Sequence, residues 1–258
     1  MGYRLDAAEH PSLAKARALY NAADFDGAIA AAAIARADPA SADAAGLVVA
    51  RSYLERYRLR TGDLTDLTAA RETLGKVQSQ ALSPRDQMDL LVGLGQALYL
   101  ANTFGAAAEL FDTALRRATS LSALSDRERS MLLDWWANAV DREAQTVDAE
   151  RRSVLLRPVM QRMDDALRDD PGNATANYWL AVAARGAGDA ERAWHAAVAA
   201  WVRAPWQPET AAALRGNIDR FVTTVLIPER GRARPPREQQ TALIDLQAQW
   251  EQIKQQWP

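Results

Sequence analysis

The segment DQMDLLVGLGQALYLANTFGAAAELFDTALRR, residues 86–117, carries the most informative pattern in the chain. In its first half, Leu91, Leu94 and Leu98 recur three and four positions apart around Gly95. In its second half, small and aromatic residues recur with the same spacing from Ala107 onward. This spacing is typical of amphipathic α-helices. The segment therefore predicts two helices joined by a turn.

Residues 174–205 repeat the same arrangement. Leu180 and Ala181 precede a Gly188-Asp189 turn, and Ala193 follows Ala181 after 12 positions, as Ala107 follows Gly95. Antiparallel helices approach each other closely only where one of them carries Gly or Ala, and a large apolar residue four positions on fills the flank. Both segments are therefore predicted to be tightly packed helical hairpins.

This pattern resembles the tetratricopeptide repeat, whose signature is W-x2-L-G-x2-Y, then A-x3-F-x2-A, then P. The resemblance covers about three quarters of the chain, roughly residues 12–205. The second-helix markers lie 42, 37, 52 and 34 positions apart, against a family period of about 34; these markers are Ala28, Ala70, Ala107, Val159 and Ala193. The resemblance implies an all-α, right-handed superhelix of about five antiparallel hairpins.

We expect residues 1–205 to form the repeat region, with hairpins at about 12–38, 43–80, 85–118, 126–170 and 174–205. Residues 206–258 are expected to add capping helices to the same domain. One such helix, at 209–226, would end at a proline- and arginine-rich connector, 228–237.

The last helix carries an apolar seam with alternating spacings of three and four, made by Leu243, Leu246, Trp250, Ile253 and Trp257. A terminal hairpin exposes an apolar face that needs a cap, so we expect this helix to fold back onto it. The alternative is that the helix, within residues 238–257, pairs with a second chain or a partner helix.

All eight tryptophans follow residue 134. Helical spacing favours core positions for most of them. A tryptophan that is exposed would instead mark an interaction hot spot.

Composition excludes several classes of function. The chain has 258 residues, no cysteine and a net charge of -2, so disulfides, thiolate metal sites and a general electrostatic case for nucleic acid are excluded. It has no uninterrupted apolar run of about 18 residues, which predicts no membrane span. No apolar signal-peptide segment opens the chain, and the location is left as cytoplasmic or periplasmic. The 28 arginines against three lysines favour a GC-rich, bacterial genome.

No catalytic constellation is apparent. His195 follows Glu191 by four positions but lacks a third metal ligand, and His10 precedes a proline near the terminus. We therefore expect no metal, no cofactor and no enzymatic activity. A basic run at Arg230, Arg232, Arg234 and Arg237 is either a solvated connector or a contact for phosphate or an acidic partner.

In the family that the chain resembles, the first helix of each repeat lines a concave groove that binds peptides or helices. The resemblance implies these groove positions here: Arg17, Tyr20, Arg51, Leu54, Gln96, Tyr99, Asn138, Asp141, Val182 and Arg185. It implies a non-catalytic scaffold or adaptor for a protein or peptide; the alternative is a cell-envelope or secretion-associated assembly factor or chaperone with the same fold. Two further expectations stay open: that the chain's own helices fill the groove, and that reversing the charge of Arg17 and Arg51 weakens a partner without unfolding the protein.

Overall fold

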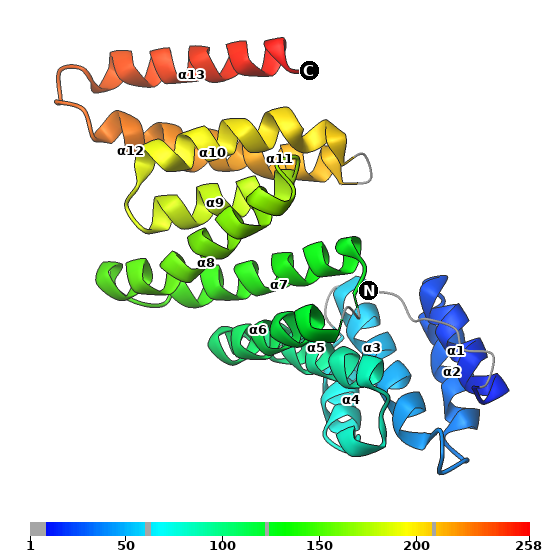
Figure 1. The fold of residues 1–258 in the computed structure, drawn as a ribbon. Helices are drawn as coiled ribbons and strands as arrows, with labels where there is room; N and C mark the ends of the chain where they lie inside the picture. The colour runs from blue at the N-terminus through cyan, green and yellow to red at the C-terminus, as the bar shows by residue number, and fades with distance from the viewer. Residues whose placement is uncertain (1–8, 60–62, 122–123, 208–209) are drawn as a thin grey trace. The chain divides into compact units, whose positions relative to one another are not determined.

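The computed structural model describes residues 9–59, 63–121, 124–207 and 210–258. All regular structure in these ranges is helical, which confirms the all-α helical-repeat class (Figure 1). The chain divides into two compact units, Met1–Ala139 and Val140–Pro258, called unit 1 and unit 2 below.

Unit 1 consists of helical hairpins. Its helices are α1 (Pro11–Asn21), α2 (Phe25–Ala35), α3 (Ala42–Leu59), α4 (Leu64–Leu74), the short η1 (Ser79–Ala81), α5 (Pro84–Leu100), α6 (Phe104–Leu121) and most of α7 (Asp126–Ala144). Helix α1 packs on α2, α3 on α4 and α5 on α6, and α3 also contacts α1 and α5. The first helices of successive hairpins therefore lie next to one another.

Unit 2 continues with α8 (Ala149–Asp169), α9 (Ala174–Gly186), α10 (Ala190–Arg203), η2 (Ala204–Trp206), α11 (Ala211–Phe221), η3 (Val222–Leu226), α12 (Ile227–Arg232) and α13 (Gln239–Gln256). Helix α9 packs on α10, and α8 also packs on α9. Each of the five segments expected to form a hairpin contains two helices.

The repeat pattern assigns ten positions, nine of them Gly or Ala and one Val159, to close helix contact. All are buried: Ala16, Ala28, Ala50, Ala70, Gly95, Ala107, Ala137, Val159, Ala181 and Ala193. Gly95 shows why size matters, because a Cβ there would lie 2.6 Å from the buried ring of Phe111. The sequence rule for close helix packing therefore holds where α5 meets α6.

Three hairpin turns share one backbone conformation. Ala23, Asn102 and Gly188 have φ values of 60°, 59° and 89°. In each turn the next residue donates its backbone N–H to a carbonyl five positions earlier, at 2.9 Å. This pattern closes the first helix with a left-handed residue. Asp24 and Asp189 then cap the following helices.

The connector expected at 228–237 is partly helical. The helix expected to end at Leu226 does not end there, because α11 continues through the π-helical turn η3 into α12, which ends at Arg232. Pro228 lies in the first turn of α12, where its missing N–H is tolerated. The wider π turn fits around the proline, so the break expected from this residue does not occur.

Helix α13 folds back onto unit 2. Trp250 is fully buried, and its ring lies 5.4 Å from Trp201 and 6.2 Å from Trp194, both on α10. The Trp250 indole donates a 2.8 Å hydrogen bond to Asp219 on α11. Trp257 is half-exposed, but its carbonyl oxygen accepts a hydrogen bond from Trp201. The helix thus covers the end of the α9–α10 hairpin.

Candidate binding surface

The predicted groove positions divide into two sets by burial. Five are buried, namely Arg17, Tyr20, Arg51, Leu54 and Gln96. Five are partly exposed, namely Tyr99, Asn138, Asp141, Val182 and Arg185. The first set cannot contact a partner without rearrangement, so the two sets have different roles.

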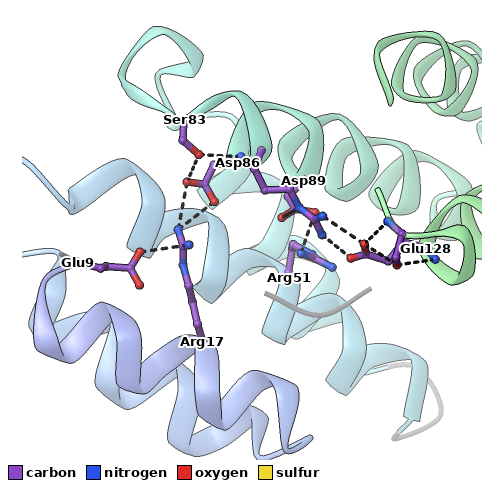
Figure 2. A network of polar contacts seen from close by, with 9 residues as sticks. Glu9, Arg17, Arg51, Ser83, Asp86, Asp89 and Glu128 are labelled. Atoms are coloured by element: carbon purple, nitrogen blue, oxygen red, sulfur yellow. Dashed lines mark hydrogen bonds and ion pairs between the residues drawn. The ribbon is translucent and has the colours of Figure 1, made fainter. Parts of the chain in front are cut away.

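Arg17 forms a buried ion pair with a distant hairpin. Its Nη2 lies 2.9 and 3.1 Å from the two carboxylate oxygens of Asp86, and Glu9 contacts its Nη1 at 3.1 Å (Figure 2). Ser83 donates its hydroxyl to Asp86 at 2.8 Å and accepts the backbone N–H of Asp86 at 3.1 Å. The cap of α5 thereby orients the carboxylate that binds α1.

Arg51 takes the equivalent place on α3. Its Nη1 lies 3.3 Å from Asp89 Oδ1, and both side chains are 1% exposed or less. Its guanidinium also stacks on Tyr20, 5.0 Å from the ring centroid. Arg85 reaches the second oxygen of Asp89 at 3.2 Å. Asp89 thus joins α3 to α5, and both helices are the first of their hairpins.

The network reaches the start of α7 through Glu128. Arg85 forms two hydrogen bonds with the Glu128 carboxylate, of 2.5 and 3.3 Å. Glu128 accepts the Ser125 backbone N–H at 3.0 Å, and its own N–H donates to Ser125 Oγ at 3.3 Å, which is the capping box expected from the sequence. Burial alone would raise the pKa of Glu128, but the bonds from Arg85 and Ser125 outweigh it and lower that pKa to about 2.

These contacts change the interpretation of the two arginines. Reversing a buried charge places it against a carboxylate in a poorly solvated site and is strongly destabilising. The expectation that Arg17→Glu with Arg51→Glu leaves the fold intact is therefore inconsistent with the structure. Nothing in the local sequence indicated this, because Arg17 and Asp86 are 69 positions apart.

An aromatic cluster in unit 1 is formed by residues of α5 and α7 together with Phe104, the first residue of α6. Tyr99 donates its hydroxyl to Asn138 Oδ1 at 2.7 Å. Its ring makes edge-on contacts of 5.2 Å with Trp135 and with Phe104. All four side chains are partly exposed. Two predicted positions are thus brought together, and they are joined by Trp135, one of the tryptophans for which helical spacing favours a core position. We call these four residues the α5–α7 cluster.

In unit 2, Arg185 is held by the chain itself. Its guanidinium forms a bidentate pair with Glu229 on α12, and the bond to Glu229 raises the pKa of Arg185. Burial raises the pKa of Asp141, against the lowering effects of Gln145 and Arg185. Val182 is partly buried on α9. The polar side chains of Arg185 and Asp141 interact with other residues of unit 2, so few of their polar atoms are available to a ligand.

Two kinds of feature are absent from the described ranges. They contain no group of three or more metal-ligating side chains. No helix in them is both long and apolar enough to cross a bilayer.

The hairpins, their small-residue interfaces and the α5–α7 cluster define a helical-repeat protein with a candidate interaction surface. The family model of the tetratricopeptide repeat matches residues 61–122 and 161–216. These two matches show that the chain contains tetratricopeptide repeats, which indicates a protein–protein interaction scaffold. A search of curated proteins found no match to it.

Proposed function

We propose that the protein is a non-catalytic scaffold that binds a protein or peptide segment on the first-helix face of unit 1, at the α5–α7 cluster. The observation that carries this proposal is the partly exposed Tyr99–Asn138–Trp135 contact on neighbouring first helices. Aromatic rings offer a partner a large contact area at little entropic cost, and Asn138 adds amide hydrogen-bonding groups.

The buried and partly buried ion pairs support this location. They fix the spacing of α1, α3, α5 and α7 without contact from a partner. A surface that is already rigid pays less entropy on binding. We therefore place the partner-binding residues at the partly exposed positions and give Arg17 and Arg51 a structural role.

Affinity capture with a matched pair of variants tests this proposal. The cluster variant is Tyr99→Ala with Asn138→Ala, and the control is Glu109→Ala, an exposed residue on the second helix α6. We expect a protein that wild type and control retain and the cluster variant loses, while all three keep their helical circular dichroism. Equal capture by all three proteins would refute this site.

The envelope-assembly or chaperone alternative requires the same fold and remains a prediction, as does a bacterial origin. Fractionation of cells that express the full gene would separate an envelope location from a cytoplasmic one.

A further inference from the structure

A cleft of about 410 Å³ lies between α12, the following turn and the first half of α13. One wall carries three arginines, Arg230, Arg234 and Arg237. The opposite wall is a face of α13 that includes Thr241, Asp245 and Gln249, with Leu246 between them. The cleft belongs entirely to unit 2 and is separate from the α5–α7 cluster.

The three arginines differ in what they contact. Arg230 is anchored: it pairs with Glu191 at 2.9 Å, donates to the carbonyl of Ala190, and lies over the Trp194 ring at 5.2 Å. Arg234 and Arg237 are exposed, and no side chain in the described ranges pairs with their guanidinium groups. The cleft therefore has one fixed cationic wall residue and two guanidinium groups available to a ligand.

The walls of the cleft are held in register by close packing. A Cβ at Gly231 would lie 2.5 Å from a Leu243 methyl group, so the Leu243 side chain of α13 packs directly on the α12 backbone there. The buried Trp250 anchors the other half of α13. A ligand thus meets a formed cleft.

We propose that this cleft is a second binding site, which takes the carboxylate side chains of an acidic peptide segment between Arg234 and Arg237. Planar guanidinium groups bind carboxylates through paired hydrogen bonds. Leu246 offers apolar contact to the methylene groups of a glutamate, and Thr241 and Gln249 offer polar contacts to the peptide backbone. Asp245 and Glu238 oppose an anion on the α13 side, which directs the carboxylate toward the arginine wall.

Fluorescence anisotropy with a fluorescein-labelled oligoglutamate peptide tests the site, with labelled oligoglutamine as the neutral comparison. The cleft variant is Arg234→Gln with Arg237→Gln. The control is Arg220→Gln with Arg232→Gln, which removes the same charge from two exposed arginines of unit 2 outside the cleft. We expect the cleft variant to bind oligoglutamate at least about tenfold more weakly, the control to stay within about twofold of wild type, and oligoglutamine not to bind.

Asp245→Asn provides a test by gain of binding. Removing this negative charge should tighten oligoglutamate binding about threefold, and the gain should shrink with added salt because the charges are exposed. Equal loss in the cleft variant and the control would reduce the effect to net charge and overturn the proposal. The proposal would also be overturned if wild type did not bind oligoglutamate. The same holds if Arg234 and Arg237 bound inorganic phosphate but no acidic peptide. None of these results would affect the α5–α7 cluster, which the capture experiment tests.

Discussion

Arg51 Nη1 and Asp89 Oδ1 lie 3.3 Å apart inside unit 1, on the first helices of two successive hairpins. The equivalent pair, Arg17 with Asp86, joins α1 to α5. Because the repeat brings the first helices of its hairpins close together, a charge on one first helix can be neutralised by a carboxylate on another. These arginines therefore hold hairpins together, although their helix face is the one that binds ligands in this family.

Replacing Asp89 with Ala should destabilise the protein strongly. It leaves Arg51 buried and deprived of its carboxylate, a change that costs about 3–5 kcal/mol. The matched control is Asp165→Ala, which removes the exposed partner of Arg168 on α8 and should cost no more than about 1 kcal/mol. Urea unfolding followed by circular dichroism measures both. Similar losses for the two variants would contradict the structural role of the pair.

Glu128 should contribute to stability in a pH-dependent manner. Its pKa falls from an ordinary value of 4.5 to about 2 in the folded state, where Arg85 and Ser125 hold the charged form. The contribution is therefore complete above about pH 4.5 and is lost as the pH falls toward 2. Glu128→Gln should lower the melting temperature at neutral pH, and its difference from wild type should shrink across this window. A difference that is constant with pH would show that the carboxylate charge is not involved.

The left-handed turn positions predict a reciprocal pair of substitutions. Ala23 has a φ of 60°, which costs a non-glycine residue about 1 kcal/mol. Ala23→Gly should therefore stabilise the protein by up to about 1 kcal/mol, whereas Gly188→Ala, at a φ of 89°, should destabilise it by a similar amount. Thermal melts of the two variants measure this. If both substitutions changed the stability in the same direction, the positive φ at these positions would not explain the effects.

Trp250 should dominate the attachment of α13. Replacing this fully buried ring with Ala removes its contacts with Trp194 and Trp201 and should cost about 3–5 kcal/mol. Trp257→Ala is the control, because its side chain is 52% exposed and its bonds to α10 and α11 use the carbonyl oxygen. If Trp250→Ala leaves stability unchanged but dissolves a dimer, the helix pairs with a second chain instead.

The hairpins were predictable because the signal for close helix packing is local. Gly95 and Ala107 lie within one segment, and the spacing between them follows from helix geometry alone. The π turn at Val222–Leu226 was not predictable. In a sequence, Pro228 indicates the end of a helix, and only the structure shows the wider turn that precedes it.

The candidate site was only half predictable. The resemblance implied that Tyr99 and Asn138 lie on the same face of the first helices, and their side chains form a hydrogen bond. The same reasoning placed Arg51 on that face without its partner, since Asp89 comes from another hairpin. One signal could have revealed it: arginines occupy the same repeat position in the first two hairpins, and two acidic residues three positions apart begin the third.

Site-specific photo-cross-linking tests the central claim most directly. A photoreactive phenylalanine analogue replaces Trp135 in the α5–α7 cluster in one variant and Glu109 on α6 in another, and each is irradiated in cells of the native host. The account predicts a discrete cross-linked protein from position 135 that is absent from position 109 and is reduced by Asn138→Ala. Cross-links to the same protein only from position 109 would place the partner on the second-helix face and contradict the account.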